Sequence, residues 1–250
     1  MKKTALLFDI TGVLFWDSRL RFIRALGVRS VLYYLLTHRT NPLRVCLNLL
    51  HRMSTCEKQT LTPISYKNTP LPDCISAWQH GHITSTELLQ QILLYIEQAE
   101  QEGFFKSKLE KRMVTGIMSL LLDAEQLLKL AKPNIRLIRL IKKIKSQGKH
   151  KLIIVSNLAH ETFDLLAKTY PELLELFEGV VISAHIGMVK PNTAIYEHVL
   201  NHYELEAQHC LFIDDQEDNI LAAQTMGING IIYRRFRPLK QQLRQFGIVD

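Results

Sequence analysis

The second half of the chain alternates short apolar runs with longer segments in which apolar residues recur every three or four positions. Short apolar runs are typical of buried strands, whereas the longer period indicates helices. The pattern predicts strands at residues 151–155, 179–183, 210–213 and 230–233, and helices at 161–168, 193–203 and 219–226. A further strand is expected at 4–8, and an amphipathic helix at 135–147 leads into the second strand.

Strands that alternate with helices imply right-handed βαβ units and therefore a parallel sheet. Residues 14–133 show no clear strand pattern, and we interpret them as helical, with a break rich in Thr, Pro and Asn at 60–72. We therefore predict an α/β protein. Its Rossmann-like parallel-sheet core comprises residues 1–17 and 134–250, and residues 18–133 are inserted as an all-helical cap.

Polar groups suited to chemistry stand at the ends of the predicted elements. Three strands are followed at once by polar residues, which are Asp9, then Ser156 and Asn157, then Asp214 and Asp215. Lys190 is expected at the start of a helix, where the dipole and free N–H groups favour an anion, and Pro191 suits the first turn. In open α/β sheets ligands bind beyond the carboxyl ends of the strands, so these side chains are expected to line one crevice.

The three carboxylates of this set, from Asp9, Asp214 and Asp215, imply a metal ion. Close together, they cannot all stay ionised without a cation. A hard divalent ion such as Mg²⁺ meets that need, because it prefers oxygen ligands. An oxygen-ligated metal beside an ammonium group and a spare carboxylate makes a site for phosphoryl transfer. The residues therefore predict a magnesium-dependent enzyme that acts on a small phosphorylated substrate.

Taken in order, these motifs resemble those of the haloacid dehalogenase superfamily, over residues 3–17 and 130–235. The first motif of that family is Asp-x-Asp-x-Thr/Val, and here residues 9–13 are DITGV. Residues 78–87 (WQHGHITSTE) and 187–196 (GMVKPNTAIY) are similar to the branch with a small helical cap. That branch includes bacterial sugar-phosphate phosphatases of the glucose-1-phosphatase type.

The resemblance implies which residues form the nucleophile and the metal site. It makes Asp9 the nucleophile that forms an aspartyl-phosphate. It makes the backbone carbonyl of Thr11 a metal ligand, with Asp214 and Asp215 holding Mg²⁺ directly and through water. Asn219 completes the pattern DDxxxN and is implied to support the metal-binding loop.

The other motif residues are implied to bind the phosphoryl group. Ser156 and Asn157 would donate hydrogen bonds to it, and Lys190 would neutralise both the phosphate and Asp9. Taken alone, Ser156 and Asn157 could instead cap the helix that follows them. Within the full set of motifs, contact with phosphate is the favoured interpretation.

Thr11 departs from the family pattern, whose second Asp protonates the leaving group and then activates water. Thr cannot do either with comparable strength. The alternatives are a slow or specialised phosphatase, an enzyme with a long-lived aspartyl-phosphate similar to P-type ion pumps, a dehalogenase-like C–X hydrolase, or a catalytically weak binding or regulatory protein. The paired acids Asp214 and Asp215 favour a retained metal and therefore disfavour the dehalogenase.

Charge is unevenly distributed along the chain, whose net charge is +7. Between Asp17 and Glu57 there is no acidic residue, but there are seven arginines, interleaved with apolar groups. This segment could form a membrane-surface helix, a nucleic-acid patch or a surface for an anionic substrate. Amphipathic helices with solvated basic faces are the favoured interpretation. Of the other three, a surface for an anionic substrate is preferred, because the motifs elsewhere point to phosphate, and neither membrane-surface contact nor nucleic-acid binding is expected.

Two pairs of residues, one in the cap and one on the segment that leads to it, each allow two interpretations. His80 and His82 flank Gly81 and could reach a substrate, but we expect both to be exposed turn residues. Phe15 and Trp16 follow the first motif and could either cover the site or pack in the core.

Composition and cysteine usage favour a cytoplasmic protein. The chain is 47% hydrophobic and 22% charged, which is ordinary for a globular protein. Its four cysteines show no metal-binding spacing and are expected to be reduced thiols. The apolar run behind the first three residues is shorter than the roughly 7–15 residues of a signal-peptide core. No stretch approaches the ~20 apolar residues that span a bilayer.

Overall fold

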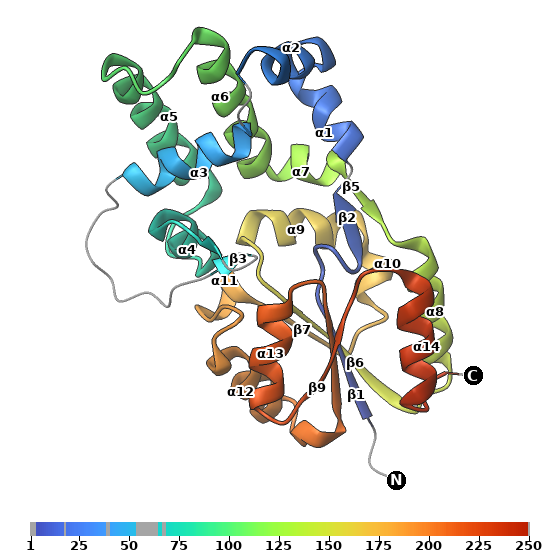
Figure 1. Cartoon of the computed structure of the whole chain (residues 1–250). Helices are drawn as coiled ribbons and strands as arrows, with labels where there is room; N and C mark the ends of the chain where they lie inside the picture. The colour runs from blue at the N-terminus through green and yellow to red at the C-terminus, as the bar shows by residue number, and fades with distance from the viewer. Residues whose placement is uncertain (1–3, 18, 39–40, 54–64, 67–68, 250) are drawn as a thin grey trace.

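A five-stranded parallel sheet forms the centre of the computed structural model, which describes residues 4–17, 19–38, 41–53, 65–66 and 69–249 (Figure 1). The strand order is β7-β6-β1-β8-β9, and every neighbouring pair is parallel. The strands are β1 (Thr4–Phe8), β6 (His150–Ser156), β7 (Gly179–Ile182), β8 (Cys210–Asp214) and β9 (Asn229–Ile232). Their carboxyl ends therefore lie along one edge of the sheet.

Helices cover both faces of the sheet, because successive side chains of a strand point to opposite sides. Leu6 and Phe8 of β1 belong to one buried cluster, and Ala5 and Leu7 belong to the other. The first face packs against α8 (Ile135–Ser146), α9 (His160–Thr169), α10 (Pro171–Leu174) and α14 (Phe236–Gln245). The second face packs against α12 (Thr193–His202) and α13 (Glu217–Thr225).

In the described part of the chain, seven helices form a separate layer, above the carboxyl-end edge of the sheet in Figure 1. They are α1 (Arg19–Leu26), α2 (Val28–His38), α3 (Pro42–Arg52), α4 (Asp73–Gln79), α5 (Ser85–Gln101), α6 (Lys108–Leu122) and α7 (Ala124–Leu130). This layer has its own buried core, around Leu49, Leu88 and Val114. The prediction of a Rossmann-like parallel sheet with a helical cap is confirmed.

The chain passes between the sheet and the helical layer through a two-stranded antiparallel ribbon. Its strands are β2 (Phe15–Asp17) and β5 (Ala131–Pro133). Asn134 fastens the ribbon to the core, because its Nδ2 donates to the carbonyl of Val13 and to the hydroxyl of Tyr233, both at 2.8 Å. We propose that the ribbon is the boundary between core and cap.

The expected elements of the core are present with small differences. Each predicted strand lies within one residue of the observed bounds, and each predicted helix within two. The predictions that Lys190 starts a helix and that Pro191 lies in its first turn were wrong. α12 begins at Thr193, because Asn192 is the N-cap and its Oδ1 accepts from the amide of Ala194 at 2.9 Å. Four helices of the core were not predicted, namely α10, α11 (Ser183–Ile186), the 3₁₀ turn η1 (Ala207–His209) and α14.

The prediction that residues 14–133 contain no strand was also wrong. Besides β2 and β5, the pair β3 (Ser65–Tyr66) and β4 (Thr69–Pro70) lies there. Strands of two or three residues are too short to give a period-two pattern. Most of the predicted break at 60–72 lies outside the described residues. In the part of the chain that the structure describes, no helix has the length and apolar character needed to cross a membrane.

Candidate active site

Asp9 directly follows β1 and is buried at the carboxyl-end edge of the sheet, with 5% of its surface exposed. Its Oδ1 accepts hydrogen bonds from Ser156 Oγ and from Lys190 Nζ, both at 2.8 Å. Its amide donates to the carbonyl of Ile213 at 3.0 Å. Because β1 lies between β6 and β8, residues that are far apart in sequence meet at this carboxylate.

Lys190 holds two carboxylates together inside the protein. Its Nζ donates to Asp9 Oδ1 at 2.8 Å, to Asp214 Oδ2 at 2.7 Å and to the carbonyl of Val155 at 2.9 Å. An ammonium group has three donors, so all of them are used. Burial favours the neutral amine, but the two carboxylates, Asp214 most strongly, outweigh it and raise the pKa of Lys190. The side chain is therefore a fixed positive charge.

Asn157 positions the backbone of Lys190. Its Oδ1 accepts from the Lys190 amide and its Nδ2 donates to the Lys190 carbonyl, both at 2.8 Å. This pair of bonds fixes where the lysine side chain begins. The structure thus gives the Asn157 side chain a partner that the sequence did not indicate, and a contact of Asn157 with phosphate stays a proposal.

Asp214 is fully buried at the end of β8 and is held by the loop that follows it. Its Oδ1 accepts from the amide of Gln216 at 2.7 Å, and its Oδ2 accepts from Asn219 Nδ2 at 3.0 Å as well as from Lys190. The carbonyl of Asn219 in turn accepts from the Tyr196 hydroxyl at 2.8 Å. The Asn219 side chain therefore contacts the first of the two paired acids directly.

Asp215 lies against the turn that follows Asp9. Gly12 has a φ of 85°, and a Cβ there would lie only 2.6 Å from Asp215 Cγ. Position 12 needs glycine for two reasons: its φ is positive, and Asp215 approaches its Cα too closely to leave room for a Cβ. Burial and the neighbouring Asp214 raise the pKa of Asp215, while Lys190 and Arg234 oppose the shift. The Asp215 carbonyl also accepts a hydrogen bond from Arg234 Nη1.

The carboxylates of Asp9, Asp214 and Asp215 can each offer one oxygen within 4.8 Å of the others. Burial raises the pKa of Asp9 to about 7; Lys190 opposes that shift and Asp214 adds to it. When all three are ionised, the local charge is one ammonium against three carboxylates. A cation would neutralise the excess, and the all-oxygen donor set fits Mg²⁺ rather than a softer metal.

Thr11 lies in the turn behind Asp9 and is exposed, unlike the buried residues of the site. The turn is fixed because the amide of Gly12 donates to the carbonyl of Phe15 at 2.7 Å, and Phe15 donates to the carbonyl of Ile10 at 2.9 Å. The structure thus brings seven of the predicted residues, including Asn219, into one cluster at the strand ends. Thr11, the eighth, stands at the exposed surface of the turn behind Asp9.

The helical cap contacts the edge of this cluster through the end of α4, which sequence reasoning missed. Gln79 Oε1 accepts a long hydrogen bond of 3.5 Å from Asn157 Nδ2, and the Gln79 carbonyl accepts from Ser183 Oγ at 2.7 Å. At the start of α5, Ser85 donates to Glu161 through its amide at 2.8 Å and its hydroxyl at 3.1 Å. These contacts join the cap to the loop after β6 and to α9.

At Gly81 the cap approaches the core closely. A Cβ at Gly81 would lie 2.3 Å from the Ala184 carbonyl oxygen. The expectation that both neighbouring histidines are exposed was wrong for His80, which is buried with its Nδ1 2.8 Å from the carbonyl of Ser76. His82 is exposed. The ring of His80 turns back onto its own helix, and a glycine pattern alone does not indicate this.

The two aromatics after the first motif differ in environment. Phe15 is buried in the core and packs against Tyr170, with ring centroids 5.2 Å apart. Trp16 is 40% exposed and meets Tyr233 edge to face.

Comparison with known proteins gives a consistent family. The family model described as "Hydrolase: haloacid dehalogenase-like hydrolase" matches residues 3–227. The sesquiterpene phosphatase astK of Aspergillus oryzae is 34% identical over 100 residues, which is 40% of this chain and 50% of that protein. The chain therefore spans about half the length of this relative.

Solved structures of similar fold cover nearly the whole chain. A predicted HAD-like family hydrolase from Porphyromonas gingivalis has a TM-score of 0.59 at 17% identity, covering 97% of this chain and 98% of that one. A HAD family enzyme from Bacteroides thetaiotaomicron, in complex with magnesium and inorganic phosphate, has a TM-score of 0.56 at 18% identity, covering 93% and 95%. At these identities the likeness shows the fold.

Proposed function

The chain belongs to the haloacid dehalogenase-like hydrolase family, and from that premise we propose that it hydrolyses small phosphate monoesters through an aspartyl-phosphate on Asp9, with Mg²⁺ as cofactor. The observation that carries the proposal is the buried cluster at the strand ends. There, Lys190 bridges Asp9 and Asp214, and Asp215 stands beside them. A fixed ammonium among three carboxylates suits a dianionic substrate that arrives with a divalent cation.

In the proposed first step, a carboxylate oxygen of Asp9 forms a bond to phosphorus as the bond from phosphorus to the ester oxygen breaks. The hydrogen bonds from Ser156 and Lys190 fix the orientation of the Asp9 carboxylate. In the second step, water attacks the phosphorus, inorganic phosphate leaves, and the Asp9 carboxylate is restored. Lys190 stays protonated throughout and balances the charge that develops on the phosphoryl oxygens.

The residues proposed to hold Mg²⁺ are Asp9, Asp214, Asp215 and the carbonyl of Thr11. When bound, the metal would supply positive charge to the phosphoryl oxygens. Ser156 is proposed to contact the phosphoryl group by redirecting its hydroxyl. Asn157 is proposed to support binding of the phosphoryl group through the backbone segment around Lys190, which its hydrogen bonds stabilise.

Thr11 sets the expected limit of the activity. The departing alkoxide needs a proton and the attacking water needs a base, and the hydroxyl of Thr11 is weak at both tasks. We therefore propose a slow enzyme, or one specialised for substrates with good leaving groups such as aryl or acyl phosphates. The alternatives are a catalytically weak binding or regulatory protein and a dehalogenase-like C–X hydrolase.

Phosphate release from a panel of aryl, acyl, sugar and glycerol phosphates, in Mg²⁺ and in EDTA, tests the proposal. The expected result is release in Mg²⁺ only, fastest for aryl and acyl phosphates. Halide release from 2-haloacids in EDTA would instead establish the C–X hydrolase. Tight binding of phosphate esters without turnover would establish the binding protein.

A further inference from the structure

Helix α2 is apolar on two neighbouring faces, and one of them is buried in the cap. Val31 and Tyr34 pack with Met113 of α6 in a small cluster. The Tyr34 hydroxyl also donates to Glu110 Oε1 at 3.0 Å, so its polar end is satisfied inside the cap. These contacts anchor α2 and fix which side of the helix faces outward.

The neighbouring face of α2 carries a stripe of exposed aliphatic residues. Its exposed fractions are 45% for Val28, 55% for Leu32, 51% for Leu35 and 78% for Leu36. Their spacing of four, seven and eight residues from the first puts them on one face of the helix. We call these four residues the outer face of α2. A surface helix normally carries polar residues there, so such a stripe marks a contact with something apolar.

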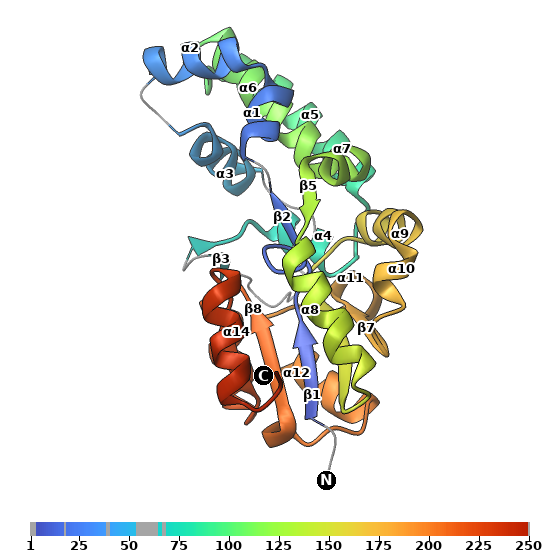
Figure 2. The same cartoon turned by 90° about the vertical axis from the view of Figure 1, so that its right-hand side faces the viewer.

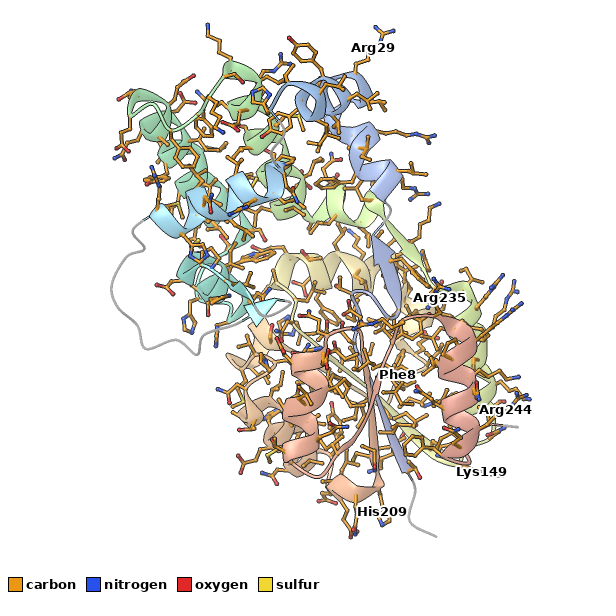
Figure 3. All side chains as sticks on the ribbon, viewed as in Figure 1. Phe8, Arg29, Lys149, His209, Arg235 and Arg244 are labelled. Atoms are coloured by element: carbon orange, nitrogen blue, oxygen red, sulfur yellow. The ribbon has the colours of Figure 1, made fainter. Side chains whose placement is uncertain are left out.

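Arg29 and Tyr33 border the outer face of α2. Arg29 lies three residues before Leu32 and seven before Leu36, so it stands beside both on the helix surface. Tyr33 follows one turn later and is 62% exposed. Figure 3 shows Arg29 pointing away from the protein at the end farthest from the sheet. Arginine and tyrosine combine an apolar stem with a polar tip, which suits the boundary between water and hydrocarbon.

The charge carried by α1, α2 and α3 themselves has one sign. From residue 18 to residue 56 the sequence has seven arginines and no acidic residue. Arg24 of α1 and Arg44 of α3 are exposed, as is Arg29. Exposed aliphatics bordered by arginines, without acids, match a surface that is apolar inside and negatively charged outside.

We propose that the outer face of α2 docks on an anionic lipid membrane surface. The aliphatic stripe enters the headgroup boundary, and Arg24 and Arg29 meet lipid phosphates. A second copy of the chain fits this face less well, because it would bring two arginine-rich surfaces together without acids to pair them. In Figures 1 and 2, α2 lies at the end of the cap away from the sheet, so a docked protein keeps its core in water.

This proposal does not depend on phosphatase chemistry, and a binding measurement tests it. The full chain is sedimented with vesicles of phosphatidylcholine alone and of phosphatidylcholine mixed with phosphatidylserine, at low and high salt. The expected result is binding to the anionic vesicles, at least about tenfold weaker binding to the neutral ones, and weakening by salt.

Two double variants separate the apolar and charged contributions, and each has a matched control. Leu32→Gln with Leu36→Gln is compared with Leu94→Gln plus Leu221→Gln, which removes two exposed leucines elsewhere. The first pair should lose at least about tenfold in vesicle affinity, and the second should bind as the natural protein does.

For charge, Arg24→Gln with Arg29→Gln is compared with Arg136→Gln plus Arg139→Gln on the exposed side of α8. The first pair should lose affinity for anionic vesicles, and the second should keep most of it. Thermal melting of all four variants checks that they fold.

Three outcomes would overturn the proposal. One is no binding to anionic vesicles at low salt. Another is an equal loss of affinity in each test variant and its control. The third is self-association in solution, without vesicles, that the Leu32→Gln and Leu36→Gln changes abolish, because a second copy would then be the occupant of this face.

Discussion

At the carboxyl ends of β1, β6 and β8, charged and hydroxyl side chains are buried, whereas on the outer face of α2 aliphatic side chains are exposed. Both regions depart from the usual distribution of polar and apolar groups, but in opposite directions. In the first, buried donors and acceptors meet each other: Lys190 uses three donors, and Asp214 accepts from three groups. In the second, the apolar groups meet solvent.

The difference indicates why the protein has each of these two regions. A buried charge cluster is a weak source of stability, since desolvation offsets much of the Coulomb attraction, so chemistry is the better reason for its presence. An exposed aliphatic stripe adds little to the fold, and contact with an external partner would account for it. We therefore propose turnover at the strand ends and attachment at α2. The following experiments would break or sharpen that division.

Replacing Asp9 has the largest expected effect. Asp9→Asn keeps the size of the side chain but cannot form an acyl-phosphate, so turnover should fall by at least about 10³-fold. Turnover is measured with an aryl phosphate in Mg²⁺, folding by thermal melting, and attachment by vesicle sedimentation. Vesicle affinity should not change. A variant that turns over substrate near the natural rate would show that Asp9 is not the nucleophile.

Thr11→Asp should act in the opposite direction. An added carboxyl group can protonate the leaving group and activate water, so turnover of alkyl phosphates should rise by on the order of 10²-fold. Thr11→Asn is the matched control, because Asn has nearly the same shape as Asp but cannot act as an acid or a base. The natural protein should release a burst of alcohol ahead of phosphate, since its second step lacks a base. If neither the burst nor the gain is found, another residue already transfers the proton.

The raised pKa of Asp9 also predicts that the stability of the protein depends on pH. Burial raises its pKa in the folded protein to about 7 from an ordinary value of 3.8, so the unfolded chain ionises first. Ionisation of Asp9 therefore opposes folding progressively as the pH rises from about 4 to about 7, and the free energy of unfolding falls by roughly 1.4 kcal/mol for each pH unit in that range. Below pH ~4 this cost is absent, because the carboxyl group is protonated in both states.

Mg²⁺ should offset that cost, because it binds the folded site. The gain in melting temperature on adding Mg²⁺ should be larger at about pH 7.5 than at about pH 5, and Asp9→Asn should reduce the difference. Asp73→Asn, an exposed acid at the start of α4, serves as the control. An equal gain at both pH values in the natural protein would show that the metal does not bind at Asp9.

Glu161→Gln has the smallest expected effect and tests whether the cap and core act together. The carboxylate accepts from the amide and hydroxyl of Ser85, and a neutral amide is a weaker acceptor, so about 1 kcal/mol of this contact should be lost. We expect a change of a few-fold in KM, a smaller change in kcat and no change in vesicle affinity. Glu172→Gln on α10 is the control. Equal effects of both variants on KM and kcat would show that the contact between Ser85 and Glu161 has no part in the mechanism.

Local pattern was sufficient for the strands and four of the helices of the core, and for the position of most of the cluster. Bounded apolar runs predicted the five strands, and Asp9, Ser156 and Asp214 follow from their places at strand ends. What could not be predicted depends on partners distant in sequence. Glu161 meets Ser85 across 76 residues, and no local period encodes that pair. The Asn157 side chain likewise bonds to the backbone of Lys190, which a motif of residue types cannot specify.

The ribbon of β2 and β5 also bears on the order in which the chain folds. Ser156 must reach Asp9 across 147 residues, and Asn134 reaches Val13 across 121 of them. Once the ribbon has formed, the segment left to close between β1 and β6 is about 26 residues. Loop closure costs about 0.6 kcal/mol for each doubling of length, so an early ribbon lowers the entropy cost of pairing the central strands by about 1.5 kcal/mol. A long insertion whose ends are tied together therefore shifts most of its loop-closure cost from the sheet to the ribbon, which has to form across the insertion first.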